Sequence, residues 1–233
     1  MPRPILLLLH GALGAAGQVA PLVPLLETRF IPLTFGFPGH GDVPLDGPFT
    51  TEHFADSLIA HLETEQRGPV DCFGYSMGGY VGLEVARRRP DLVRAVATLG
   101  TKFAWSSVVA ERELKFLDPA LIRAKVPYFA DQLQLRHTAL PWEEVLRLTG
   151  EMMTALGASP LLGPDALRQV SQRVRIMVGD RDATVTLEES AAAAKALPSG
   201  ELEVLPMTAH PFEQVPLPRL VQSLTDLFLG TDA

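Results

Sequence analysis

The fold of this chain is constrained most by one stretch, Gly-Tyr-Ser-Met-Gly-Gly at residues 74–79. An apolar run at 69–73, typical of a buried strand, precedes it, and a helical pattern at 80–88 follows it. A serine with a glycine two residues away on each side, between strand and helix, indicates a sharp turn that exposes the serine hydroxyl. The glycines are needed because side chains there would collide with the neighbouring strand or helix. The stretch therefore predicts a strand–turn–helix unit with a nucleophile, Ser76, at its tip, before a helix N-terminus that favours negative charge.

Strand and helix patterns alternate along the chain. The expected strands are 5–9, 30–35, 69–73, 92–99, 174–178 and 202–205, and the expected helices are 16–28, 51–66, 80–88, 186–197 and 212–229. Alternation of this kind predicts an α/β fold with an about six-stranded, mostly parallel sheet and helices on both faces. Pro21 and Pro24 predict a broken first helix, and Thr51 is the expected N-cap of the second.

The alternation stops between residues 101 and 164. No strand pattern occurs there, and apolar residues recur at helical spacing instead. We therefore expect a single domain over 1–233, with a helical insert at 101–164 between the core halves 1–100 and 165–233. Trp105, Met152 and Met153 lie in this insert, where they either line an apolar pocket or fill the insert's own core.

Composition excludes several classes of protein. The net charge is −7, and the Arg87–Arg89 cluster lies at an expected helix end, where cations complement the dipole, so no nucleic-acid partner is expected. The one cysteine, Cys72, falls in an expected buried strand, which excludes an internal disulfide and suits a reducing compartment. His53 and His61 are too far apart on one helix to form a metal site. The apolar run before His10 is too short for a signal peptide or a membrane span, so we expect a cytoplasmic protein without a membrane partner.

A serine hydroxyl needs a general base, a group that orients the base, and hydrogen-bond donors for the oxyanion. In an open parallel sheet these groups lie at the carboxyl ends of strands. Asp180 and Asp182 both follow the expected strand 174–178, and His210 follows the last strand. His210 is therefore the expected base, with His10 and His40 as alternatives, and the acid is Asp182 or Asp180.

The oxyanion donors are expected to be backbone N–H groups near the serine. Met77 follows Ser76 directly and supplies one of them. The loop after the first strand reads His10-Gly11-Ala12, and a glycine there lets the backbone approach the site closely. Ala12 is therefore the expected second donor.

Five segments together resemble the α/β-hydrolase family over residues 5–215. They are His-Gly-Ala at 10–12, Pro-Gly-His-Gly at 38–41, the serine turn at 74–79, Gly-Asp-Arg-Asp at 179–182 and the segment around His210. The resemblance implies the α/β-hydrolase fold and a helical cap at 101–164, and its spacing favours Asp182 over Asp180. The chain departs from the family in having no room for an N-terminal hairpin. It also has Gly36 and Asp42-Val43 where the glycine-rich loop usually has an aspartate and a serine.

The expected function is that of a serine hydrolase that cleaves a carboxylic ester or related acyl bond of a small molecule through an acyl-enzyme, with no metal or cofactor. Candidate substrate contacts are Tyr75, Trp105, Met152 and Met153. The resemblance also covers thioesterases, carbon–carbon bond hydrolases and a lyase of menaquinone synthesis, several of which hold a substrate carboxylate with arginines; Arg112, Arg123 and Arg136 are candidates. A second alternative is a small-molecule receptor on a hydrolase scaffold. Turnover of simple esters separates it from an enzyme. No oligomeric state is predicted.

Overall fold

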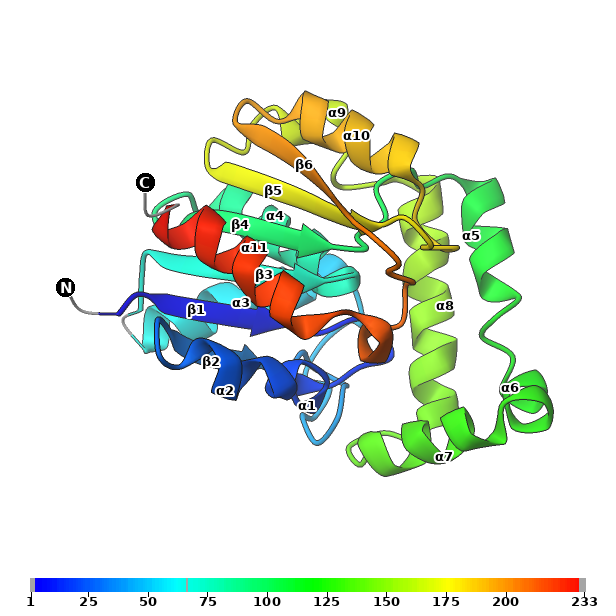
Figure 1. Ribbon diagram of the computed structural model, residues 1–233. Coiled ribbons are helices and arrows are strands. Elements are labelled where there is room, and N and C mark those ends of the chain that lie inside the picture. Colours follow the sequence, from blue (N-terminus) through cyan, green and yellow to red (C-terminus); the bar gives the residue numbers. More distant parts are fainter. Residues whose placement is uncertain (1–2, 66, 231–233) are drawn as a thin grey trace.

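Six strands form one parallel sheet in the computed structural model, which describes residues 3–65 and 67–230 (Figure 1). They are β1 (Ile5–Leu9), β2 (Ile31–Phe35), β3 (Val70–Tyr75), β4 (Val93–Leu99), β5 (Arg173–Gly179) and β6 (Gly200–Leu205). Their order is β2-β1-β3-β4-β5-β6, and every neighbouring pair is parallel. The α/β fold class with a six-stranded sheet is therefore confirmed.

Strand β1 shows why the sheet needs helices on both faces. Its side chains alternate, so that Leu7 and Leu9 pack into one core cluster while Leu6 and Leu8 pack into another. All four are fully or almost fully buried, as expected for a parallel strand covered on both sides. Because the strands are parallel, their carboxyl ends meet at the same edge of the sheet.

Helices cover the two faces as separate groups. The cluster that contains Leu7 is closed by α3 (Thr51–Thr64), α4 (Met77–Arg88), α9 (Pro164–Leu167) and α10 (Leu187–Ala196). The cluster that contains Leu6 is closed by α1 (Ala16–Val19), η1 (Ala20–Leu22), α2 (Val23–Leu26) and α11 (Leu217–Leu229). Figure 1 shows α1, α2 and α11 on the near face of the sheet and α3 and α4 on the far face. The prediction of a broken first helix is confirmed, since the helix is divided into the three short pieces α1, η1 and α2.

Several helix ends differ from the prediction by one to three residues; α4, for example, begins at Met77 and not at residue 80. The N-cap of α3 is Thr50, not Thr51, because the Thr50 hydroxyl accepts a hydrogen bond from the His53 N–H at 3.2 Å. The helix ends at Thr64, and the predicted end at Gln66 lies outside the described residues.

The closing helix predicted at 212–229 is interrupted. It begins as the short helix η2 (Phe212–Gln214), and α11 starts only at Leu217. Pro216 lacks an N–H for a helical hydrogen bond and disfavours the helical conformation at the residue before it, and Val215 is accordingly extended, with ψ 130°.

The insert at 101–164, described throughout, contains helices and no strand. They are α5 (Ser107–Leu114), α6 (Pro119–Lys125), α7 (Pro127–Arg136) and α8 (Trp142–Ala158). They stand beyond the carboxyl ends of the strands (Figure 1). Ile122, Leu133 and Trp142 belong to a small core of the insert itself. Val145 and Met152 of α8 instead join the large core on the α3–α4 face, so α8 is anchored more firmly than α6 and α7.

The surroundings of Cys72 and of the arginine cluster at 87–89 indicate structural roles for these residues. Cys72 is buried in β3, and burial raises the pKa of its thiol to about 12, so the thiol is unreactive. Arg87, Arg88 and Arg89 at the end of α4 each form an ion pair with a carboxylate.

Within residues 3–65 and 67–230, no helix combines the length and the apolar composition that crossing a membrane requires.

Candidate active site

Ser76 occupies a strained turn between β3 and α4. Its backbone has φ 51° and ψ −116°, a combination that residues other than glycine rarely adopt. Neighbours hold this conformation from both sides. The Ser76 N–H donates to the Leu99 carbonyl at 2.8 Å, and the Ser76 carbonyl accepts from the Gly79 N–H at 3.1 Å and the Thr101 hydroxyl at 2.9 Å.

The glycines around the turn are required by contact distances. A Cβ atom on Gly74 would lie 2.3 Å from the Gly79 nitrogen. A Cβ atom on Gly78 would lie 2.6 Å from the Leu9 carbonyl oxygen of strand β1. The turn can approach the helix and the neighbouring strand this closely only without those side chains, as the sequence predicted.

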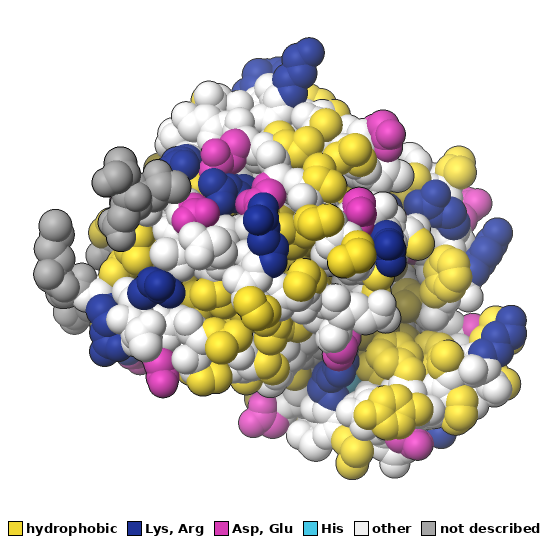
Figure 2. Space-filling view, viewed as in Figure 1, with side chains coloured by type: hydrophobic (Ala, Val, Ile, Leu, Met, Phe, Trp, Pro, Cys, Tyr) yellow, Lys and Arg dark blue, Asp and Glu magenta, His cyan; other side chains and the backbone are white. Residues whose placement is uncertain are grey.

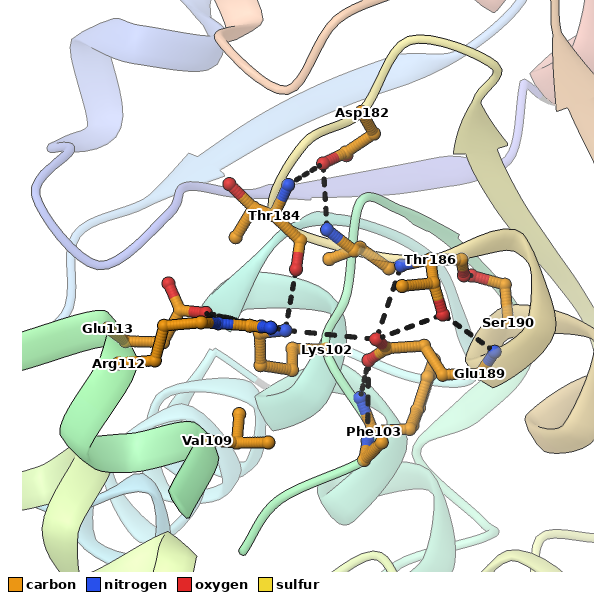
Figure 3. Close-up of polar contacts among 12 residues, drawn as sticks. Lys102, Phe103, Val109, Arg112, Glu113, Asp182, Thr184, Thr186, Glu189 and Ser190 are labelled. Carbon is orange, nitrogen blue, oxygen red and sulfur yellow. Dashed lines mark hydrogen bonds and ion pairs between the residues drawn. The ribbon is translucent and has the colours of Figure 1, made fainter. Parts of the chain in front are cut away.

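His210 lies next to Asp182. Its Nδ1 is 2.8 Å from Asp182 Oδ2. Oδ1 of the same carboxylate accepts the N–H groups of Val185 and Thr184, both at 2.8 Å, and Figure 3 shows Asp182 beside Thr184. Burial alone raises the pKa of Asp182, but the hydrogen bond and charge of His210 and the two amide bonds outweigh it and hold the pKa below its usual value. The carboxylate is therefore ionised at neutral pH and fixes the orientation of the imidazole.

Asp180, the alternative acid, has a different partner. Its Oδ1 accepts the Thr208 N–H at 3.1 Å, which connects the end of β5 to the loop that leads to His210. The structure thus places Asp182, and not Asp180, in contact with the histidine ring.

Two residues shape the space around His210. Gly100 has φ 62°, and a Cβ atom there would lie 3.2 Å from His210 Nδ1 and 3.3 Å from Asp182 Oδ2, so the glycine leaves room for this pair. The Tyr75 hydroxyl donates to the His210 carbonyl at 2.8 Å. Tyr75 was predicted as a substrate contact; its ring does line a cavity, but its hydroxyl already holds the His210 loop.

His10 and His40, the alternative bases, are directed at the backbone. The Phe37 N–H donates to His10 Nε2 at 3.2 Å, and His10 Nδ1 is 2.8 Å from the Gly11 carbonyl. His40 Nε2 is 2.8 Å from the Ala12 carbonyl. Both rings are fully buried, and this burial lowers the pKa of His40 to about 4 and that of His10 well below its usual value.

Two cavities of unequal size meet at Ser76. The wide one, about 600 Å³, also reaches His210, Tyr75, Arg136 and Met153. Figure 2 shows a hollow with hydrophobic side chains along its wall, between the sheet part of the molecule and the helices at its lower right. The narrow one, about 50 Å³, is lined by Ala12, Thr51, Ser76, Met77, Tyr80, Lys102, Trp105, Met152, Met153 and Leu156.

The narrow cavity brings together most of the residues that the sequence singled out. Ala12 and Met77 lie there beside Ser76, which is the placement expected of groups that donate to one oxyanion. Trp105 and Met152 line the same space, and Met153 lines both cavities. Met152 also packs in the large core and not in the small core of the insert, so of the two interpretations offered for it only the pocket describes its position.

The three candidate arginines differ in position. Arg136 lines the wide cavity and donates from Nη1 to the Leu13 carbonyl at 2.7 Å. Arg112 and Arg123 are exposed and pair with glutamates of the insert. Among the residues that the structure describes, no group of three or more His, Cys, Asp or Glu side chains could hold a metal ion.

A buried lysine beside the acid loop was not singled out from the sequence. The Lys102 Nζ donates to the Thr184 carbonyl at 2.6 Å and lies 3.7 Å from a carboxylate oxygen of both Glu113 and Glu189 (Figure 3). Glu189 accepts the Phe103 N–H at 3.0 Å as well. This network joins the Asp182 loop to the beginning of the insert. Among the residues of this network, Glu189 has a recognisable sequence signal. It is the third helical residue of the capping box at the start of α10.

Known proteins resemble this chain in sequence. A family model described as "Alpha/beta hydrolase family" matches residues 6–222. The chain is 33% identical over 140 residues to a pimeloyl-[acyl-carrier protein] methyl ester esterase of Neisseria meningitidis, covering 56% of this chain and 53% of that protein. It is 28% identical to a protein of the same name from Chromobacterium violaceum, over 89% of this chain and 87% of the other. The chain thus spans about half the length of the first of these relatives.

Solved structures resemble the whole chain. NosK from Streptomyces actuosus superposes with a TM-score of 0.79 at 21% identity, over 100% of both chains. The enol-lactonase from Burkholderia xenovorans superposes with a TM-score of 0.74 at 18% identity, over 98% of this chain and 92% of the other. At such identities the likeness concerns the fold. The family model, which matches most of the chain, establishes that this chain belongs to the alpha/beta hydrolase family.

Proposed function

We propose that this protein is a serine hydrolase that cleaves a carboxylic ester through a covalent acyl-enzyme. The observation that carries the proposal is the 2.8 Å contact between His210 Nδ1 and Asp182 Oδ2, beside a cavity that His210 shares with Ser76. Because Nδ1 donates to the carboxylate, the neutral ring keeps its lone pair on Nε2, the nitrogen that can accept a proton.

Each residue then has one role. Ser76 Oγ attacks the carbonyl carbon and its proton passes to His210 Nε2, while the N–H groups of Ala12 and Met77 stabilise the oxyanion. Collapse of the tetrahedral intermediate expels the alcohol, which takes the proton from His210. Water then attacks the acyl-enzyme by the same route, releases the acid and restores the serine.

The unequal cavities support a substrate with one small and one long substituent on the ester. The narrow cavity, at about 50 Å³, has space for a group of methyl size, and the wide one, at about 600 Å³, has space for an extended acyl chain. Relatives named pimeloyl-[acyl-carrier protein] methyl ester esterase also support a methyl ester of an elongated acyl group. We therefore propose small-alkyl esters of long acids, including carrier-bound acids, as the substrate class.

The test combines labelling and turnover. A fluorophosphonate should label the wild-type protein and not Ser76→Ala. For one long acyl group, kcat/KM should fall from methyl to ethyl to butyl ester, because the narrow cavity excludes the larger alcohols. Esters and thioesters of the same acid, compared side by side, separate an esterase from a thioesterase. Tight ligand binding without turnover of any ester would contradict the proposal and favour the receptor alternative.

A further inference from the structure

Three consecutive peptide carbonyls in the loop after β1 each meet a different histidine ring. The Gly11 oxygen is 2.8 Å from His10 Nδ1, and the Ala12 oxygen is 2.8 Å from His40 Nε2. The Leu13 oxygen is 3.2 Å from His137 Nε2. Since Ala12 is the proposed oxyanion donor next to Ser76, these contacts surround the part of the backbone whose orientation matters most for the proposed reaction.

The histidines come from three separate parts of the chain. His10 follows the first strand, His40 lies in the glycine-rich loop after β2, and His137 follows α7 in the insert. Their rings nevertheless gather under one loop, with centroids 5.1 Å apart for His10 and His40 and 6.1 Å apart for His40 and His137. All three residues are buried. Buried polar groups are expensive unless each finds a partner, and here the loop carbonyls are the partners.

Backbone N–H groups assign the protons on two of the rings. The Phe37 N–H donates to His10 Nε2 at 3.2 Å, so the proton of neutral His10 lies on Nδ1, which faces the Gly11 carbonyl. The Gly41 N–H donates to His137 Nδ1 at 3.0 Å, so the proton of neutral His137 lies on Nε2, which faces the Leu13 carbonyl.

His40 faces a carbonyl with each nitrogen, Ala12 at 2.8 Å and Pro38 at 3.1 Å. A neutral ring carries one proton, and we place it on Nε2, which makes the shorter contact, to the Ala12 carbonyl. Each histidine is thereby a donor to the loop. The surroundings of the cluster keep it neutral, because burial and the neighbouring Arg136 guanidinium both disfavour a further positive charge on His10 and His137.

The orientation of the Ala12 N–H follows from peptide geometry. In a trans peptide the C=O and the N–H point in opposite directions. When His10 and the Gly14 N–H hold the Gly11 carbonyl on one side, the Ala12 N–H must point to the other. Ser76 is nearby, since a Cβ atom on Gly11 would lie 3.5 Å from the Ser76 Cβ. His40 fixes the next peptide, between Ala12 and Leu13, in the same way, because it holds the Ala12 carbonyl.

We propose that His10, His40 and His137 are positioning residues that hold the loop at 11–13 so that the Ala12 N–H is directed at the oxyanion. This inference rests on the proposed function. His137 adds a link to the insert, because the Thr138 and Ala139 N–H groups donate to the Gly41 carbonyl at 2.9 and 3.0 Å. The insert thereby supports the loop as well as covering the site.

Substituting each histidine by asparagine and, separately, by glutamine tests the proposal. The ring nitrogen that faces the loop is Nδ1 in His10 but Nε2 in His40 and His137. An asparagine amide can replace Nδ1 and a glutamine amide can replace Nε2. His10 contacts the loop through Nδ1, so His10→Asn should keep kcat higher than His10→Gln. His40 and His137 contact it through Nε2, so His40→Gln and His137→Gln should keep kcat higher than the matching asparagine variants.

We expect the unfavourable variant of His10 and of His40 to lose at least about tenfold in kcat with little change in KM, since removal of an oxyanion donor costs about 10²–10³. The effect at His137 should be smaller, because Arg136 also donates to the Leu13 carbonyl. Inhibition by an alkyl boronic acid, which forms a tetrahedral adduct on serine, should weaken in parallel with kcat. His53→Asn and His53→Gln, which change a half-buried histidine paired with the exposed Asp46, serve as matched controls for the substitutions.

A merely structural role would give a different pattern. The melting temperatures would fall, and the same substitution, asparagine or glutamine, would be better at all three positions. That result, or an unchanged kcat in all six variants, would overturn the inference. Failure of the proposed function is distinguishable, because the wild-type protein itself would then not hydrolyse esters or bind the boronic acid at Ser76.

Discussion

At the scale of single residues, Ser76 combines backbone strain with a small side chain. Its φ of 51° and ψ of −116° are imposed by hydrogen bonds to Leu99, Gly79 and Thr101. The Ser76 hydroxyl makes no hydrogen bond to any residue that the structure describes. Removal of the hydroxyl should therefore affect chemistry and leave the turn intact.

For Ser76→Ala we expect a loss of at least about three orders of magnitude in ester turnover, because only oxyanion and binding contributions remain. The melting temperature should change little. Steady-state kinetics with a small activated ester and thermal unfolding measure the two quantities. Wild-type-like turnover by this variant would show that Ser76 is not the nucleophile.

The two aspartates after β5 give a second prediction at this scale. Asp182→Asn should lower kcat by about 10⁴, because an amide no longer holds the histidine tautomer that leaves Nε2 free. Asp180→Asn should cost far less, since its carboxylate accepts the Thr208 N–H at 3.1 Å and an amide oxygen can replace it as the acceptor. The same ester assay ranks the two variants, and the reverse ranking would mean that the acid is Asp180.

At the scale of elements, the insert is uneven. Helix α8 contributes Val145, Met152 and Leu156 to the large core, whereas α6 and α7 rest on the small cluster around Leu133. Exposed apolar side chains are frequent on that side of the insert; they include Phe116, Leu121, Val126, Tyr128 and Leu135. Fewer buried contacts mean a lower free energy of local opening.

We therefore expect amide hydrogens of α6 and α7 to exchange faster than those of β3 and β4, and those of α8 to exchange at an intermediate rate. Binding of an apolar inhibitor in the wide cavity should slow exchange in α6 and α7, since Val126 and Phe129 line it. Hydrogen exchange followed by mass spectrometry measures this. Equal protection of α6, α7 and the central strands would identify the insert as rigid scaffold.

The cavities give a further prediction for the insert. Met153 lies between the narrow and the wide cavity, so Met153→Ala should relax the preference for methyl over butyl esters. A small activated ester should still be cleaved at about the wild-type rate. The ratio of kcat/KM values for the two alkyl esters measures the effect, and an unchanged ratio would show that Met153 does not set the size of the narrow cavity.

Sequence patterns predicted the elements better than their ends. Apolar runs located the four inner strands because a parallel strand in the middle of a sheet is buried on both faces. The edge strands β2 and β6 are partly exposed and were located by their place in the alternation of strands and helices. The N-cap of α3 and the interruption of the closing helix at Pro216 were not predicted. Two adjacent threonines do not reveal which of them is the N-cap, and apolar residues at helical spacing do not reveal where a helix is interrupted. The contacts of Lys102 and the gathering of His10, His40 and His137 depend on segments far apart in sequence, which no local pattern brings together.

At the scale of the whole molecule, the buried histidines couple the fold to pH. His40 and His137 both have a pKa lowered from 6.5 to about 4, because burial penalises the charged ring. An unfolded chain therefore binds more protons than the folded one between these values, and stability rises with pH across this window. The stabilisation from neutral burial is present above about pH 6.5 and is lost as the pH falls toward 4.

For His40 alone the loss is on the order of 3 kcal/mol over this window, since each pKa unit corresponds to about 1.4 kcal/mol. We expect the free energy of unfolding in urea to decrease steeply between pH 6.5 and 4. His40→Gln removes one titrating group and should flatten that dependence, because a glutamine side chain does not change its charge between pH 6.5 and 4. An identical slope in the wild type and in His40→Gln would mean that His40 titrates alike in the folded and unfolded chains, and the burial argument for the cluster would fail.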